Sequence, residues 1–132
     1  MYSHYYAPRK RGDSSYDPAM PVVGIEVLNL DDLSKNIKLT AIVDSGSDGS
    51  FIPERHLHAL GIESVRKAQV RGVSGIAYSV DMYMVKLKVG PFELYGTRVV
   101  GDKQNEIIVG RNVINQLVVT LNGLAEVVEV SN

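Results

Sequence analysis

AIVDSGS, residues 41–47, is the most informative stretch of the sequence, because an acid follows directly after three apolar residues. A carboxylate at the end of a buried strand is costly unless it is paired, hydrogen-bonded or protonated. Gly46 lets the backbone turn tightly and approach a neighbour or a ligand, and the Ser45 hydroxyl can form a hydrogen bond across a close contact. Asp44 is therefore a constrained acid on a tight turn. The residues alone favour an Asx-turn between strand and loop over a catalytic group.

Two further segments follow in the chain. Gly72-Val73-Ser74-Gly75 precedes an expected strand, and Ile107-Ile108-Val109-Gly110-Arg111-Asn112 precedes an expected short helix and strand. Together with residues 42–47 they match, in order, the active-site signature, the glycine-rich flap tip and the Gly-Arg-Asn segment of retroviral proteases. Over residues 22–122 the chain resembles a retropepsin-like aspartic protease.

The resemblance implies an all-β fold, a closed β-barrel-like domain with one or two short helices that is active as a C2 homodimer. The chain has one Asp-Ser-Gly signature, whereas pepsin-like chains carry two, and 132 residues leave no room for a second lobe. Asp44 would face Asp44 of a second copy, and the two carboxyls would share a proton. One would activate a water as general base while the other polarises the scissile carbonyl. This chemistry needs no metal and no organic cofactor.

The resemblance also implies supporting roles near this acid. Ser45 would lock the two active-site loops together, although the viral enzymes most often have Thr there. Gly46 would accept a hydrogen bond from the substrate backbone. Asp48 would hold the substrate main chain and pair with Arg111; the alternative is an ordinary surface ion pair.

The remaining expected substrate contacts lie in the flap and in the pocket walls. Val73 would form the flap tip with Gly72 and Gly75 as pivots, and Ser74 stands where viral flaps usually have Gly. Phe51 and Ile108 would wall side-chain pockets; the alternative for both is ordinary core.

These residues imply an aspartic endopeptidase that acts on a peptide or protein substrate. The alternative is a retropepsin-fold module that binds a peptide strand or dimerises without useful turnover. A monomer that becomes active only at high concentration is a third possibility. The chain continues past Asn122 into another apolar run, which is more similar to cellular retropepsin-like domains of bacteria and of ubiquitin-linked shuttle proteins than to the viral enzymes.

The rest of the pattern predicts the domain organisation. Residues 1–20 show no period of 2 or 3.6 and are predicted to form a flexible arm ahead of a domain over residues 21–132. The alternatives for the arm are a strand that docks only in an assembly and a segment that is cleaved, with self-cleavage near Tyr16 to Val23. Strands are expected at 22–30, 37–43, 68–73, 78–89, 92–100, 106–109, 118–121 and 125–130. Short helices are expected from Pro53 to Gly61 and over 112–117, and a hairpin turn at Asn122-Gly123.

Composition excludes several other classes of protein. The 14 Lys and Arg residues balance 15 Asp and Glu residues, which argues against a nucleic-acid partner. The absence of cysteine excludes disulfides and thiolate metal sites. His56 and His58 are two residues apart, a poor metal-ligand spacing on a helix. With no apolar run of membrane-spanning length, the expectation is a cytoplasmic protein without a membrane partner.

Overall fold

The computed structural model describes residues 1–8, 16–103 and 105–132, which form two antiparallel or mixed sheets and two short helices. The elements in chain order are β1 (Tyr2–Tyr5), β2 (Val22–Asn29), β3 (Asp32–Val43), β4 (Ser50–Pro53), α1 (Glu54–Ala59), β5 (Arg66–Arg71), β6 (Ala77–Val89), β7 (Phe92–Asp102), β8 (Ile108–Val109), α2 (Arg111–Ile114), β9 (Val118–Asn122) and β10 (Val127–Ser131). The prediction of an all-β domain with two short helices is confirmed.

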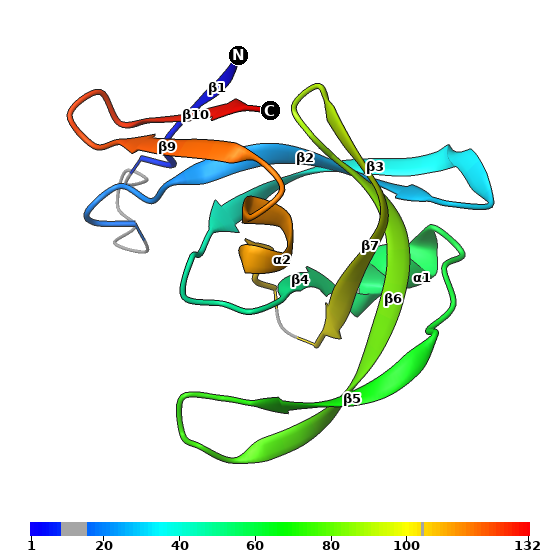
Figure 1. Ribbon diagram of the computed structural model, residues 1–132. Coiled ribbons are helices and arrows are strands. Elements are labelled where there is room, and N and C mark those ends of the chain that lie inside the picture. Colours follow the sequence, from blue (N-terminus) through cyan, green and yellow to red (C-terminus); the bar gives the residue numbers. More distant parts are fainter. Residues whose placement is uncertain (9–15, 104) are drawn as a thin grey trace.

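The larger sheet closes on itself. Its strand order is β2-β3-β8-β4-β7-β6-β5, and β2 also pairs with β6, so all of these strands except β5 form a ring. β5 and the first half of β6 leave this ring as a hairpin, which curves away from the barrel at the bottom of Figure 1. Closure of the ring covers the outer edge of β2, which an open sheet would expose.

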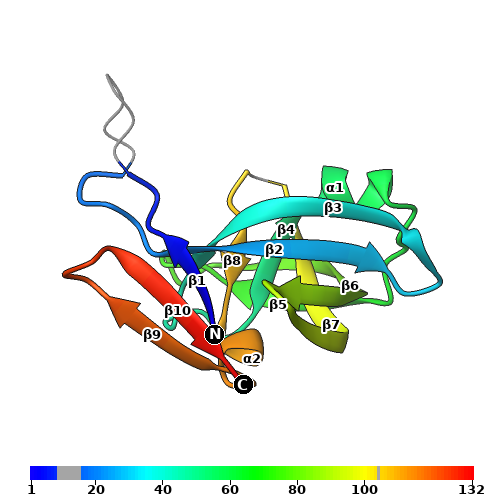
Figure 2. The same ribbon diagram turned by 90° about the horizontal axis from the view of Figure 1, so that it is seen from above.

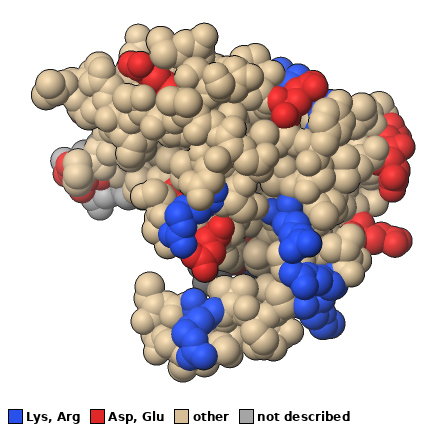
Figure 3. Space-filling view, in the orientation of Figure 1, with Lys and Arg blue, Asp and Glu red and all other residues tan. Residues whose placement is uncertain are grey.

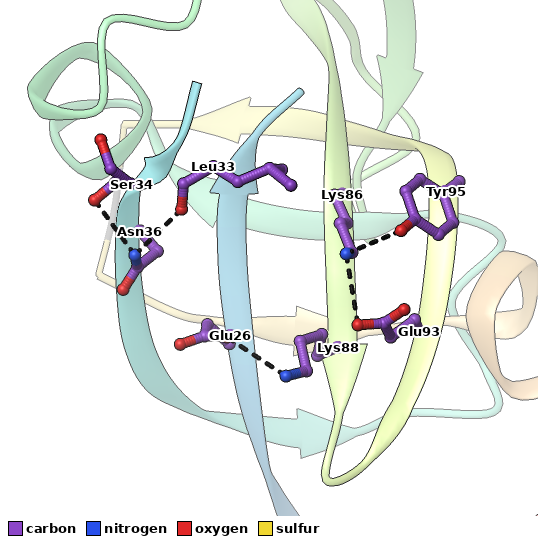
Figure 4. A network of polar contacts seen from close by, with 8 residues as sticks. All are labelled: Glu26, Leu33, Ser34, Asn36, Lys86, Lys88, Glu93 and Tyr95. Carbon is purple, nitrogen blue, oxygen red and sulfur yellow. Dashed lines mark hydrogen bonds and ion pairs between the residues drawn. The ribbon is translucent and has the colours of Figure 1, made fainter. Parts of the chain in front are cut away.

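The seam between β2 and β6 carries polar contacts on its outer face. Lys88 and Glu26 are direct cross-strand partners, with Nζ and the carboxylate 3.7 Å apart (Figure 4). Between β6 and β7, Lys86 donates a 2.9 Å hydrogen bond to the Tyr95 hydroxyl, and its Nζ lies 3.2 Å from the Glu93 carboxylate. The hydrogen bond to Tyr95 raises the pKa of Lys86, so this buried side chain stays charged.

The core fills the interior of the ring. It is built mainly from Val, Ile and Leu on alternate positions of the strands, together with Leu57 of α1 and Val113 of α2, both fully buried. As expected, α1 begins after Pro53 and ends before Gly61, whose φ of +69° suits glycine. No helix in the described residues is long and apolar enough to cross a membrane.

The smaller sheet packs against the barrel beside α2 (Figures 1 and 2) and has the order β1-β10-β9. The expected hairpin near Asn122 is confirmed, but its turn is longer than a two-residue Asn-Gly turn. Residues 123–126 form the loop: the Asn122 Oδ1 accepts from the Ala125 N–H at 3.1 Å, and Glu126 takes the left-handed conformation.

The N-terminal residues differ from the expected flexible arm. Tyr2–Tyr5 pair with β10, which brings the two termini close together in both views (Figures 1 and 2). The Tyr2 ring packs over Gly90, where a Cβ would overlap it, and its hydroxyl accepts a 3.0 Å hydrogen bond from the Gly24 N–H. The partner strand lies at the far end of the sequence, so no local pattern could indicate this pairing. Residues 9–15 of the expected arm lie outside the described residues.

Replacing Tyr2 tests whether β1 contributes to the stability of the domain. We expect Tyr2→Ala to lower the free energy of unfolding by about 1–3 kcal/mol, because the ring loses its apolar contact and Gly24 its acceptor. The control is Tyr5, which lies on the same strand and is 78% exposed. Tyr5→Ala should change the free energy of unfolding by less than about 0.5 kcal/mol. Denaturant titration of both variants measures this, and equal effects would contradict a docked β1.

Candidate active site

Asp44 lies at the point where β3 leaves the sheet. Its N–H donates a 3.0 Å hydrogen bond to the Val109 carbonyl and so continues the β3–β8 pairing by one residue. The Gly46 N–H donates to the Asp44 Oδ1 at 2.9 Å, the contact of an Asx-turn. No described residue donates a hydrogen bond to Oδ2 of this half-buried carboxyl. The turn therefore orients one carboxylate oxygen and leaves the other available.

The loop over residues 44–49 is held by the start of α2. The Arg111 N–H donates to the Ser47 carbonyl at 2.8 Å, and the Asn112 N–H donates to the Asp48 carbonyl at 3.2 Å. The first N–H groups of a helix have no partner within the helix. The loop therefore supplies the acceptors that α2 needs, and α2 fixes the loop.

Gly110 makes this contact possible. A Cβ at this position would overlap the Gly49 carbonyl and crowd the Ser47 carbonyl, which are backbone atoms that cannot rotate away. The Gly110 N–H donates to the Ser50 Oγ at 3.0 Å, and this hydroxyl donates to the Asn112 Oδ1 at 2.8 Å. Ser50, which links these two hydrogen bonds, is buried, with 2% of its surface exposed.

Arg111 contacts the same loop with its side chain. Its guanidinium donates to the Ser45 carbonyl at 2.7 Å and forms an ion pair with the Asp48 carboxylate. The structure thus brings together the two residues that the sequence analysis paired. Both are solvent-exposed, so the ion pair itself contributes at most about 1 kcal/mol.

Strand register defines an apolar wall on the same side of the sheet as Asp44. Direct cross-strand partners share a face, and the row runs through Ile42, Ile108, Phe51, Val100 and Met82. The next row, through Val43, Val109, Val99 and Tyr83, faces the core. Because side chains alternate, Asp44, two residues after Ile42, belongs to the first face. Neither Phe51 nor Ile108 belongs to the core cluster.

The hairpin of β5 and β6 ends in the expected flap segment. The Gly75 N–H donates to the Gly72 carbonyl at 2.9 Å, and Gly75 has a φ of +80°. Ser74 lies outside the left-handed region, so a side chain is tolerated there. Val73 at the tip is fully exposed. Figure 3 shows the surface hollowed between this hairpin and the barrel.

The sequence analysis did not give the roles of several residues of this arrangement. Gly110 and Asn112, named only as part of the Gly-Arg-Asn segment, hold the loop together with Ser50, for which the sequence carried no signal. Val100 and Met82 extend the wall, which depends on a strand register that the sequence does not reveal. His58, by contrast, contacts the Tyr83 hydroxyl at 3.0 Å, and no group of three potential metal ligands occurs among the described residues.

Comparisons with known proteins identify the family and the fold. A model of the aspartyl protease family matches residues 30–113. Among solved structures, the retropepsin-like aspartic protease from Rickettsia conorii covers 98% of this chain and 90% of its own, at 12% identity and a TM-score of 0.60.

Two viral enzymes are also similar. The EIAV protease complexed with the inhibitor HBY-793 has 22% identity and a TM-score of 0.55, over 74% of this chain and 86% of its own. The Simian foamy virus (mac) protease has 19% identity and a TM-score of 0.53, over 71% and 91%. At such identities these likenesses show the fold alone. No curated protein sequence matches the chain.

Gly110→Ala tests the contact between loop and helix. We expect the free energy of unfolding to fall by about 3 kcal/mol or more, because the new methyl group meets backbone on two sides. Gly123→Ala is the control: nothing lies within 4 Å of its Cβ position, and its φ is not positive. Thermal or denaturant unfolding measures both variants, and a neutral Gly110→Ala would contradict the close approach.

Proposed function

The chain belongs to the aspartyl protease family, and from that premise we propose that it is an aspartic endopeptidase that works as a homodimer. The observation that carries the proposal is the placement of Asp44: its Oδ1 is oriented by a backbone N–H, its Oδ2 is open, and both lie on the face of the apolar wall. The proposed place for an extended peptide is the hollow between this wall and the flap hairpin (Figure 3). One chain supplies one such acid, so the proposed reaction needs a second copy.

The second copy is proposed to pair through β9. This strand pairs with β10 on one side, and its other edge has no partner among the described residues. Val118 and Leu121 on it are 58% and 51% exposed. A free strand edge with apolar side chains favours pairing with another strand. Antiparallel pairing of two β9 strands would join two copies around a two-fold axis.

The proposed reaction follows from two Asp44 carboxyls that share one proton. The ionised carboxyl takes a proton from a water, which attacks the scissile carbonyl carbon, while the protonated carboxyl donates to the carbonyl oxygen. Collapse of the tetrahedral intermediate breaks the C–N bond, and a proton passes from the pair to the leaving amine. Arg111 and Gly110 position the loop and take no part in proton transfer.

The proposed substrate contacts come from the active-site loop on one side of the peptide and from the flap on the other. Gly46 and Asp48 would hold its main chain from the loop, and Gly72–Gly75 would cover it from the flap. Phe51 and Ile108 would contact its side chains. A cytoplasmic location stays a prediction.

The hypothesis of self-cleavage also stays a prediction, and the burial of residues 22 and 23 restricts where the chain can be cut. Val22 and Val23 are 3% and 2% exposed and pair with β3, so cleavage there would require β2 to open. Residues 16–19 precede the strand and are the accessible part of the expected segment.

Asp44→Asn tests the activity directly. Digestion of a mixed peptide library from mildly acidic to neutral pH should give cleavage products with the wild type and none with Asp44→Asn, as detected by mass spectrometry. The rate should show a bell-shaped pH dependence, because the pair works only with one proton bound. The asparagine keeps the Oδ1 acceptor for the Gly46 N–H, so the loop is expected to stay folded.

The control is Asp31→Asn, the same chemical change in the β2–β3 turn, which should leave the cleavage pattern unchanged. A folded wild type that cleaves no peptide at any pH would favour the alternative, a module that binds peptides without turnover.

Leu121→Asp tests the proposed dimer surface. We expect the dissociation constant of the dimer to rise at least about tenfold, because an unpaired carboxylate is buried at the interface. Leu33→Asp is the control, since Leu33 is similarly exposed, at 46%, in the β2–β3 hairpin on the far side of the molecule (Figure 1). Sedimentation across a concentration series measures both, and equal behaviour of the two variants would exclude β9 as the interface.

A further inference from the structure

Basic side chains gather around the hollow between the flap hairpin and the barrel. Figure 3 shows Lys and Arg on both sides of it, with an acidic group on its wall. On the elements that border the hollow, two basic residues have acidic partners: Lys67 of β5 lies 3.0 Å from the Asp81 carboxylate, and Arg111 of α2 pairs with Asp48. Arg66 and Arg98 form no ion pair with any described residue, and both are exposed.

Strand register places both of these arginines on the face that carries the apolar wall. Arg66 of β5 is the direct partner of Met82, which is itself paired with Val100. Arg98 lies two residues before Val100 on β7, so the two side chains share a face. Lys67, the neighbour of Arg66, faces the opposite side.

The main chain of both residues is fixed. The Asn112 Nδ2 donates a 2.9 Å hydrogen bond to the Arg98 carbonyl, which ties this part of β7 to α2. Arg66 lies at the start of the continuous β5–β6 ladder. A guanidinium on an anchored strand can bind a carboxylate with two parallel hydrogen bonds.

We propose that Arg66 and Arg98 make the chain select peptides with an acidic side chain outside the residues that flank the scissile bond. This inference rests on the proposed function and adds the substrate class to it. The wall nearest Asp44 is apolar, and the two Asp44 carboxyls repel a further acid there, so apolar residues flank the bond. The unpaired arginines lie beyond the wall, where an acidic side chain finds an opposite charge.

The test uses a short fluorescein-labelled peptide with a central Phe-Val bond between Ala and Thr residues. Copies of it carry one Glu, or one Gln, at each outer position. The ratio of kcat/KM for the Glu and Gln copies is measured for the wild type, and the ratio of their Kd values is measured by fluorescence anisotropy for Asp44→Asn. We expect the Glu copies to be favoured by about two- to fivefold at one or more outer positions, the range of an exposed ion pair. Higher salt should reduce the preference, because exposed charges are screened.

Matched variants assign the effect to the two arginines. Arg66→Gln and Arg98→Gln should each bring the ratio closer to one, and Arg66→Lys and Arg98→Lys should largely restore it. Lys67→Gln removes the same charge from the opposite face and should leave the ratio as in the wild type.

The outcomes separate this inference from the proposed function. Equal cleavage of the Glu and Gln copies by the wild type, together with equal binding of them by Asp44→Asn, would overturn the acidic preference while leaving the protease in place. Equal loss of preference in Arg66→Gln and Lys67→Gln would overturn the assignment to the wall face. A wild type that cuts no peptide would overturn the proposed function, and the anisotropy titration would still decide the preference.

Discussion

The contact between the loop over residues 44–49 and the first residues of α2 is the constraint on which the site depends. A four-residue helix is too short to be stable alone. Its leading N–H groups bind the loop carbonyls, and a glycine at position 110 removes the side chain that would separate the two segments. The loop carries the acid and the helix carries Val113 into the core. The geometry of Asp44 is therefore fixed by the packing of the whole barrel.

Side chains alternate between the two faces of the sheet, and each face has a different role. On β8, β4 and β7, one set of side chains fills the core and the adjacent set forms the wall beside Asp44. A shift of one residue in register would exchange these sets and place Tyr83 in the hollow. The register that buries one row thus also determines which residues form the wall, so the proposed substrate contacts depend on the same hydrophobic pattern that folds the domain.

The sequence predicted most elements because their signals are local. Pro53 and Gly61 bound α1, alternating apolar residues mark β2 and the second half of β6, and the Asp-Ser-Gly and Gly-Arg-Asn segments indicated the two halves of the loop contact. The prediction of a flexible arm was wrong for Tyr2–Tyr5, because β1 pairs with a strand at the far end of the sequence. The row from Ile108 to Met82 was not predicted, because it is set by register across the sheet. The turn after Asn122 shows a local failure, since the left-handed residue is Glu126 and not Gly123.

Two of the open strand edges of the described chain lie where the proposed function places another chain. Ring closure covers the edges of β2 and β6, while β1 is only four residues long and packs against the barrel through Tyr2. β5 remains open along the flap, and β9 remains open beside the termini. An open edge favours pairing with another strand, so both are candidate sites for a second chain. The peptide proposed to lie under the flap and the second copy proposed to pair with β9 meet the chain in these two regions.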